Sequence, residues 1–417
     1  MAGLLIFGFV FLLLVLVIWS IRRNPSPDLE IKTSDPIASL MPSISGLTQS
    51  AVYLGNSVEV FENGGFFDVL MAEIKAAKHT VHFETFLWKD GVLGQRLAAA
   101  LIERQRAGIQ VRVLVDASGG KKISDKVVKQ LKDAGCKFAT HHARHWYNIG
   151  VFNDRDHRKI AVIDGRVAFT GGHCITDDWL GDAETRKQAR DLSVRVRGPI
   201  VHALQGTFSE NWVENTGELL VGAECFPELE RQGDTEIHVA SLKPEGSAPA
   251  VKVLHHLAIC VAKRRIRVQN PYFLPDQEAI DELGEAVERG VDVQVMVPSA
   301  EASDMPIVQH AAHRNFEQML KLGIRIYEYN KCLLHQKVMV IDGVWCAIGS
   351  TNFDDRSFET NDEITLGIRD SAFALKLEEI FEHDRKHCAE LTLERWKKRS
   401  LLHRLQDSVL YTFNEVL

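Results

Sequence analysis

A short polar motif occurs twice in this sequence, and it limits the possible folds more strongly than any other feature. The first copy comprises His157, Lys159, Asp164, Gly171 and Gly172. The second copy, with the same intervals, comprises His335, Lys337, Asp342, Gly349 and Ser350. A repeat that served packing alone would preserve apolar periodicity, whereas here the identities fall on polar and small residues. Two copies of one motif therefore predict a duplicated fold with a single active centre built from both.

The duplication extends beyond the motif, because residues 106–113 align with residues 288–295. In the first half, the patterning predicts helix, strand, helix and strand in turn at 66–77, 80–86, 93–107 and 109–115. The second half repeats this order at 251–262, 265–270, 277–289 and 291–297. Such alternation is typical of α/β proteins. We predict similar domains at 51–220 and 221–390, related by a pseudo-two-fold axis, with both motifs at their interface.

The residue types of the motif suit the transfer of a phosphoryl group. His and Lys occupy alternate positions on what reads as a strand, so their side chains share one face. The two ammonium groups can hold a phosphate and stabilise its charge, so that neither a metal nor another cofactor is required. One neutral imidazole can attack phosphorus while the other, protonated, donates to the departing alkoxide. The small residues are expected to let the backbone approach the phosphate: Gly171, Gly172, Gly349 and Ser350.

Asp164 and Asp342 belong to the candidate catalytic set because they are part of the motif. Each precedes a glycine at a turn after the strand. A carboxylate at such a turn can bind backbone N–H groups, and this structural role is favoured over a direct catalytic one.

The motif pair resembles the phospholipase D superfamily, and its context is similar to that of the bacterial cardiolipin synthases. The closer match lies in residues 83–86, 153–159, 190–191, 198–199, 304–308 and 352–363. The resemblance implies two phospholipase D-like domains, each a mixed sheet flanked by helices. It also implies transfer of a phosphatidyl group from phosphatidylglycerol, or a similar phospholipid, to a lipid hydroxyl through a phosphohistidine.

The resemblance further assigns roles to residues outside the two motif copies. It implies that Asp191, downstream of the first motif, and Glu363, downstream of the second, are the acids that orient the histidines. It places Asn352 among the supporting or phosphate-binding residues and favours His157 as the nucleophile. Cys174 departs from the family pattern, because the first copy usually has Asn there.

Two other functions remain open from the sequence, namely hydrolysis by water, as in a phospholipase D or nuclease, and a non-catalytic lipid-binding scaffold. Two complete His–Lys pairs argue against the scaffold. The formal net charge of −7 argues against nucleic acid as a partner. The 7 cysteines show no paired C-x-x-C spacing, which indicates neither a disulfide framework nor a zinc site. The expected partners are phospholipids and a membrane, and the sequence does not specify whether the protein has protein partners.

Residues 3–21 form an apolar run interrupted only by Ser20, long enough at ~1.5 Å per residue to cross a ~30 Å hydrocarbon layer. We predict a transmembrane anchor at 1–23, with Arg22 and Arg23 on the cytoplasmic side. The catalytic domains would then lie on the cytoplasmic face of the inner membrane. Residues 24–50, rich in proline, are predicted to be a linker without helix or core.

Two further segments have alternative interpretations. Residues 391–417 are predicted to contain an amphipathic helix after a basic stretch, and both a docked helix and an interfacial membrane helix fit this pattern. His141, His142 and His145 resemble a metal tract, but no cysteine or carboxylate stands at ligand spacing, which favours a surface loop near the cleft.

Overall fold

The computed structural model describes residues 3, 7–14, 31, 33–141, 154–242 and 249–399. The chain divides into two compact units, Met1–Lys32 and Thr33–Leu417. In the first unit, residues 7–14 form a helix with exposed side chains. Most of the expected 3–21 span lies outside the described residues. Within the described residues, no helix combines the length and the apolar character needed to cross a membrane.

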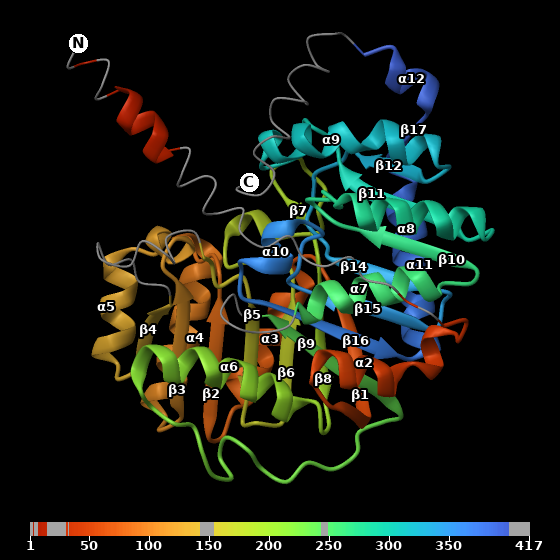
Figure 1. The fold of residues 1–417 in the computed structure, drawn as a ribbon. Helices are drawn as coiled ribbons and strands as arrows, with labels where there is room; N and C mark the ends of the chain where they lie inside the picture. The colour runs from red at the N-terminus through yellow and green to blue at the C-terminus, as the bar shows by residue number, and fades with distance from the viewer. Residues whose placement is uncertain are drawn as a thin grey trace. The chain divides into compact units, whose positions relative to one another are not determined.

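The second unit is built on one mixed sheet of 15 strands (Figure 1). The first half contributes β1 (Val52–Glu62), β2 (Thr80–Thr85), β3 (Gln110–Asp116), β4 (Lys137–His141), β5 (Lys159–Ile163), β6 (Val167–Gly171) and β8 (Leu192–Arg197). The second half contributes β9 (Thr235–Leu242), β10 (Arg265–Gln269), β11 (Asp292–Pro298), β12 (Arg325–Tyr329), β14 (Val338–Ile341), β15 (Trp345–Gly349), β16 (Glu363–Arg369) and β17 (Cys388–Leu391). A separate small sheet pairs β7 (Ala189–Arg190) with β13 (Leu333–Leu334).

The strand order confirms the duplication. From the centre outward, the first half reads β1-β8-β6-β5-β2-β3-β4 and the second reads β9-β16-β15-β14-β10-β11-β12, with β17 added at the edge. Corresponding neighbours also run in the same sense; β2 and β3 are parallel, as are β10 and β11. The expectation of a separate sheet in each half is wrong, because β1 and β9 pair antiparallel and join the halves into one sheet.

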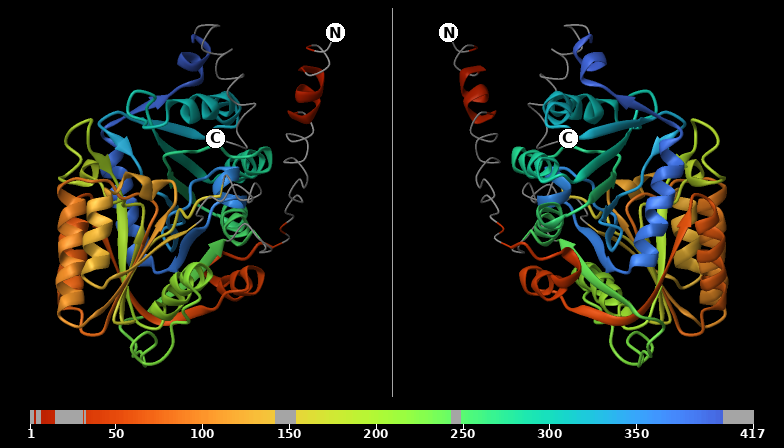
Figure 2. Two further views of the ribbon diagram at one scale, coloured as in Figure 1. Left: turned by 90° about the vertical axis from the view of Figure 1, so that its left-hand side faces the viewer. Right: turned by 90° about the vertical axis from the view of Figure 1, so that its right-hand side faces the viewer.

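Helices cover both faces of the sheet (Figure 2). In the first half, one face packs against α3 (Gly65–Ala76), α4 (Val92–Arg106) and α5 (Asp125–Asp133), and the other packs against α6 (Val201–Thr216). In the second half, the sheet contacts α7 (Ala250–Val261), α8 (Gln277–Glu288), α9 (Pro306–Lys321) and α11 (Ser371–Arg385). Shorter helices are α2 (Met41–Thr48), α10 (Asp355–Glu359), α12 (Leu393–Lys397), η1 (Ile37–Ser39), η2 (Gly119–Lys122) and η3 (Asp177–Trp179). The helices and strands expected from the patterning are confirmed within a residue or two.

The expectation of an irregular linker at 24–50 is wrong for its second part. Residues 41–48 form α2, with Pro42 in the first turn, where a missing N–H does no harm. The helix contacts α7 and β9. Its buried side chains, with those just before it, follow the spacing of one helical face: Ile37, Leu40, Met41 and Ile44. This segment is therefore part of the folded core of the second unit.

Candidate active site

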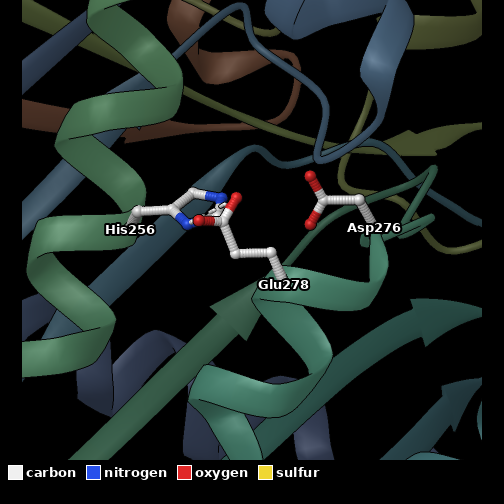
Figure 3. Close-up of side chains that lie close together, drawn as sticks. All are labelled: His256, Asp276 and Glu278. Atoms are coloured by element: carbon white, nitrogen blue, oxygen red, sulfur yellow. Dashed lines mark ion pairs between the residues drawn. The ribbon is translucent and has the colours of Figure 1, made fainter. Parts of the chain in front are cut away.

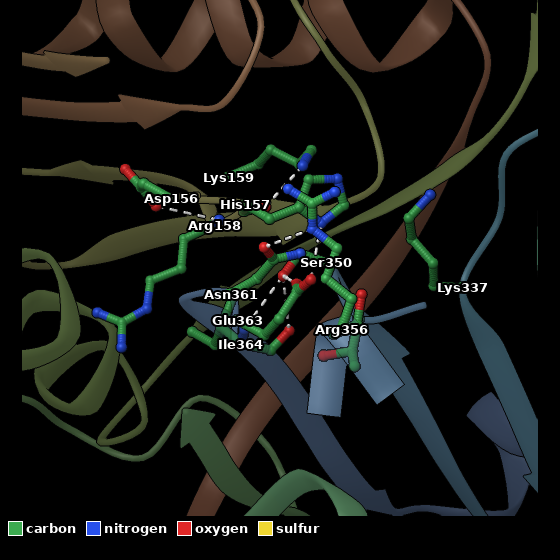
Figure 4. Close-up of polar contacts among 12 residues, drawn as sticks. Asp156, His157, Arg158, Lys159, Lys337, Ser350, Arg356, Asn361, Glu363 and Ile364 are labelled. Atoms are coloured by element: carbon green, nitrogen blue, oxygen red, sulfur yellow. Dashed lines mark hydrogen bonds and ion pairs between the residues drawn. The ribbon is translucent and has the colours of Figure 1, made fainter. Parts of the chain in front are cut away.

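The two motif copies meet in one pocket of about 440 Å³, which both His157 and His335 line. Each histidine lies just before a strand rather than on it, since β5 begins at Lys159 and β14 begins directly after Lys337. The side chains are largely buried; only 9% of His157 and 6% of His335 is exposed. The Lys159 ammonium donates a hydrogen bond to the carbonyl of His157 at 2.6 Å (Figure 4). In the second copy, the Lys337 ammonium donates to the carbonyl of His335 at 2.7 Å. The two histidines therefore share the pocket as expected, and Lys159 and Lys337 both lie near enough to lower the pKa of His157.

Each histidine is paired with the acid of the other half. His157 Nδ1 lies 2.9 Å from Glu363 Oε1, and His335 Nδ1 lies 2.7 Å from Asp191 Oδ2. The sequence associates Asp191 with the first motif and Glu363 with the second, so the pairing is crossed relative to the order in the chain. With Nδ1 held by a carboxylate, Nε2 is the ring nitrogen that faces the chemistry. Nε2 of His335 lies 3.1 Å from Lys337 Nζ.

Short backbone ladders between the halves explain the crossed pairs. β7 and β13 pair in parallel, and the N–H of His335 donates to the carbonyl of Arg190 at 2.8 Å, which places Asp191 beside the ring. On the other side, Asp156 and Asp362 form an isolated parallel bridge, and the N–H of His157 donates to the carbonyl of Asp362 at 3.0 Å. Glu363, the next residue, is thereby brought to His157.

The two orienting acids have different electrostatic environments. Burial opposes the charge of Asp191, but His335 outweighs it, and the pKa of Asp191 lies below its usual value. The same carboxylate also accepts hydrogen bonds from Trp179 Nε1 at 2.7 Å and from the N–H of Leu192 at 2.8 Å. Burial raises the pKa of Glu363 to about 7, against the opposing effects of Lys159 and a hydrogen bond from the Ser350 hydroxyl. Near neutral pH, Asp191 is ionised and Glu363 is partly protonated.

Burial and neighbouring cations lower the pKa of both imidazoles, and the opposing effect of a carboxylate is stronger at His335. Burial, together with Lys159, Lys337 and His335, lowers the pKa of His157 well below its usual value. Burial and Lys337 also lower the pKa of His335, but Asp191 opposes this shift. Burial lowers the pKa of Lys337 to about 8. His335, beside an ionised carboxylate, is the ring better placed to carry a proton.

Asp164 and Asp342 do not line the pocket. Asp164 accepts the backbone N–H groups of residues 78–80 at 2.7–2.9 Å, and Asp342 accepts those of residues 263–265 at 2.7–2.9 Å. Both have positive φ, 54° and 58°, which Asp tolerates at turns. These carboxylates tie the far ends of β5 and β14 to the turns before β2 and β10, which supports the structural role and removes them from the reacting group.

The small residues after the motif are required by neighbouring strands, and the expected contact with phosphate is not needed to explain them. A Cβ at Gly171 would lie 2.5 Å from Ser193 Cα, and one at Gly349 would lie 2.1 Å from the Ile364 carbonyl oxygen. A Cβ at Gly172 would lie 2.2 Å from Asp191 Oδ1, so this glycine leaves room for the orienting acid. At the corresponding place in the second copy, the hydroxyl of Ser350 instead bonds Glu363.

His141 lies in the interior, and the expectation of a surface loop is wrong for it. Its side chain is only 1% exposed, and its Nε2 lies 2.7 Å from Asp362 Oδ2, next to the orienting Glu363. His142 and His145 lie outside the described residues. His141 therefore belongs to the support of the His157 pair.

One group of potential metal ligands gathers within the described residues, namely His256, Asp276 and Glu278 (Figure 3). Lys252 Nζ lies 2.8 Å from Asp276 Oδ2 and 3.7 Å from Glu278 Oε2. The ammonium of Lys252 already supplies the positive charge that these carboxylates require. The group is therefore an ion-pair network that joins α7 to α8.

Comparison with known proteins identifies the family. A family model described as "Cardiolipin synthase, PLD-like domain" matches residues 70–212 and 257–385. A cardiolipin synthase of Geobacillus kaustophilus is 34% identical over 365 residues, which cover 87% of this chain and 72% of the relative. The chain belongs to the cardiolipin synthase family of phospholipase D-like proteins. Cardiolipin synthase A of Pseudomonas putida is 35% identical over 358 residues, covering 84% of this chain and 72% of that protein.

The fold of this cardiolipin synthase family member is shared with a solved structure. The phosphatidylserine synthase of Haemophilus influenzae matches with a TM-score of 0.67 at 14% identity, over 90% of this chain and 99% of that one. The family expected from the sequence is therefore confirmed, and so is the fold with two phospholipase D-like repeats.

The pocket of this cardiolipin synthase family member also contains residues that sequence reasoning missed. Trp179, Tyr272 and Arg356 line it together with Cys174 and Asn352. Trp179 holds Asp191, and its ring meets the ring of His335 edge-on, with centroids 5.0 Å apart. Tyr272 could have been found by aligning the two repeats, because it follows the strand that corresponds to β2. No local pattern points to Trp179, since its role depends on the fold of the first half.

Proposed function

We propose that the protein is a phosphatidyltransferase of the cardiolipin synthase type. It would move a phosphatidyl group from phosphatidylglycerol, or a similar phospholipid, to the hydroxyl of a second lipid through a phosphohistidine. The observation that carries the proposal is the pair of buried histidines in one pocket of a chain from this family, each held by a carboxylate of the other half.

In the first step, Nε2 of neutral His157 attacks phosphorus. A phosphorus–nitrogen bond forms, the bond from phosphorus to the head-group oxygen breaks, and protonated His335 donates its proton to that oxygen. Lys159 and Lys337 stabilise the charge on the remaining phosphoryl oxygens. Ionised Asp191 supports this assignment, because it stabilises a proton on His335. The ionised form of Glu363 accepts the Nδ1 proton of His157, which leaves the Nε2 lone pair free for attack.

The second step runs in reverse with a new alcohol. Neutral His335 removes the proton from the acceptor hydroxyl, the acceptor oxygen bonds to phosphorus, and the phosphorus–nitrogen bond to His157 breaks. The product is a new phosphodiester, and both rings return to their initial protonation states. Attack by water in place of the lipid alcohol would give hydrolysis and phosphatidic acid.

We also propose that the apolar run at 3–21 anchors the protein in the inner membrane, with the catalytic unit in the cytoplasm. This proposal rests on the sequence of the run and on the two arginines that follow it. An anchor would keep the pocket close to its lipid substrates.

The test is to incubate the purified full-length protein with phosphatidylglycerol in mixed micelles, with and without EDTA. Cardiolipin and free glycerol are expected in equal amounts in both conditions, because lysines provide the positive charge. Phosphatidic acid as the only lipid product would establish a hydrolase instead. Loss of all activity in EDTA, with recovery on adding a divalent cation, would contradict the proposed chemistry.

A further inference from the structure

The two walls of the active-site pocket are related by the duplication. Trp88 and Ile175 form an isolated parallel bridge in the first half, and Phe273 and Phe353 form the corresponding bridge in the second. The residues that precede these four are therefore equivalent in pairs, Leu87 with Tyr272 and Cys174 with Asn352. All four of these preceding residues line the pocket.

The equivalent positions differ in chemistry. The first half supplies a leucine and a buried thiol, whereas the second half supplies a phenol and a carboxamide. Asn352 is 6% exposed, and its Oδ1 is buried without a hydrogen-bond partner among the described residues. A buried carboxamide oxygen in this state costs free energy unless a bound molecule donates a hydrogen bond to it. The second-half wall is thus ready for a ligand with hydroxyl groups.

Tyr272 extends this polar wall. Its hydroxyl donates to Asp304 Oδ1 at 2.6 Å, and Asp304 also lines the pocket. Burial and the neighbouring Asp304 raise the pKa of Tyr272 well above its usual value, so the phenol keeps its proton. Asp304 is exposed, and its Oδ1 accepts the hydrogen bond from Tyr272. Its other carboxylate oxygen makes no hydrogen bond to a side chain within the described residues. A carboxylate oxygen of this kind accepts hydrogen bonds from hydroxyl groups.

The wall is held in a fixed position relative to the second motif. Asn270 Oδ1 accepts the N–H of Tyr272 and the N–H of Phe353, both at 3.2 Å. The N–H of Leu274 donates to the carbonyl of Phe353 at 2.8 Å. The loop that carries Tyr272 and the loop that carries Asn352 therefore move as one piece.

The polar wall lies within electrostatic range of the proposed general acid. Burial and Lys337 lower the pKa of His335, and Asp304 is among the carboxylates that oppose this shift. In the proposed mechanism, the leaving and the entering alcohol both exchange their proton with His335. An alcohol with a second hydroxyl would direct that hydroxyl toward groups near His335.

We propose that Tyr272, Asp304 and Asn352 form a subsite for a polyol head group, the glycerol that leaves from the donor and the lipid glycerol that enters. The inference rests on the proposed transferase function and adds the residues that recognise the alcohol. One hydroxyl reacts at phosphorus while the neighbouring hydroxyl donates to Asp304 or Asn352. At the equivalent positions of the first half, Leu87 and Cys174 offer the head group neither a phenol nor a carboxamide.

The experiment compares alcohols as acceptors of the phosphatidyl group from phosphatidylglycerol. Radiolabelled glycerol, ethanol and ethanolamine are each supplied to the full-length protein and to Asp304→Asn and Tyr272→Phe. Both variants are expected to lose about tenfold in transfer to glycerol relative to ethanol, because a site built to bind a hydroxyl loses discrimination when its partner is removed. Turnover of a soluble p-nitrophenyl phosphodiester, whose leaving group has no second hydroxyl, should fall much less in both variants than transfer to glycerol does.

The matched control is Glu301→Gln, an exposed carboxylate on the same loop that does not line the pocket. It should keep the wild-type acceptor preference. If the wild-type protein transfers to alcohols and the variants keep its preference for glycerol, the subsite is wrong and the transferase function stands. A larger loss with ethanolamine than with glycerol would identify a cation site instead. A wild-type protein that releases only phosphatidic acid with every alcohol would overturn the transferase function itself.

Discussion

At the scale of single residues, the two orienting carboxylates show how a duplicated site becomes asymmetric. Asp191 is short and is held by an indole N–H, a backbone N–H and His335. Glu363 is longer and receives a serine hydroxyl and His157. The glycine at 172 and the serine at 350 are the matching positions that allow these two arrangements. Equivalent places in the repeat therefore hold acids of different proton affinity.

The first prediction is that the covalent intermediate forms on His157. His157→Ala should abolish the phosphoryl-enzyme, because it removes the Nε2 atom that forms the phosphorus–nitrogen bond in the proposed mechanism. His335→Ala should slow its formation much less when the donor carries p-nitrophenolate, a leaving group that needs no proton. Acid quenching followed by peptide mass spectrometry locates the phosphoryl group. A phosphopeptide containing His335 would reverse the two roles.

The second prediction concerns the pH dependence of stability. The pKa of Glu363 is about 7 in the folded protein, against 4.5 for an ordinary glutamate, so the folded state binds more protons between these values. The free energy of unfolding should therefore fall as pH rises through this window. Glu363→Gln removes the titrating group. Between pH 5 and pH 8, the free energy of unfolding of this variant should therefore rise by about 2–3 kcal/mol relative to that of the wild type.

Urea unfolding of both proteins at the two pH values measures this difference. Asp191→Asn is the matched control. The pKa of Asp191 is lower in the folded protein than in the unfolded chain, so its contribution to the free energy of unfolding is constant above the unfolded-state pKa. That contribution is lost only in stronger acid. A pH-independent difference between wild type and Glu363→Gln would mean that Glu363 has an ordinary pKa in the folded protein.

At the scale of elements, local patterning predicted most helices and strands, and tertiary contacts decided the rest. The four helix–strand units expected around the alternating apolar runs are present with nearly the expected bounds. The prolines of residues 24–50 obscure the apolar spacing of α2 in the sequence, although Pro42 lies in the first turn, where a helix tolerates it. The crossed acid pairs could not be derived from spacing, since they depend on the pairing of β7 with β13 and of Asp156 with Asp362, between segments far apart in the chain.

The third prediction tests the close approach of β15 and β16. Gly349→Ala would place a methyl group 2.1 Å from the carbonyl oxygen of Ile364, which is rigid backbone in the neighbouring strand. The strands must separate, and we expect a loss of about 3 kcal/mol in the free energy of unfolding. Gly206→Ala in α6 is the control, because its new methyl group meets nothing within 4 Å. This control should stabilise the protein by about 0.5–1 kcal/mol through helix propensity.

Denaturant unfolding monitored by circular dichroism gives both values. The opposite signs expected for two Gly→Ala changes separate steric contact from backbone entropy. Equal effects of the two substitutions would show that the strands have room to accept a side chain at residue 349.

At the scale of the whole molecule, the two halves form one sheet and one pocket. β1 and β9 pair at the centre, and each motif copy contributes one histidine to the pocket. The sequence predicted the duplication and the convergence of the motifs, because the repeated intervals are visible in a single chain. It did not predict the continuous sheet, since the edges of two mixed sheets carry no signal of whether they pair.

The fourth prediction links membrane attachment to the choice between transfer and hydrolysis. An acceptor lipid competes with water at ~55 M, so transfer requires that the head group arrive at high effective concentration. Deleting residues 1–23 should lower cardiolipin formation on phosphatidylglycerol vesicles far more than turnover of a soluble short-chain phosphodiester. Parallel loss of both activities would mean that the segment is needed for folding. Unchanged cardiolipin formation would mean that the acceptor is selected entirely within the pocket.

The crossed acid pairs also constrain how the two copies could diverge after duplication. A change that removes Asp191 leaves the histidine of its own copy intact and disables the histidine of the other. Selection on either copy therefore acts on both, and the four dyad residues are inherited as one indivisible unit. The pocket-wall residues do not depend on a partner in the other copy in this way. A leucine in one copy could therefore become a tyrosine in the other while the catalytic pairs stayed in place. Duplication here kept the reaction common to both copies and left recognition free to differ.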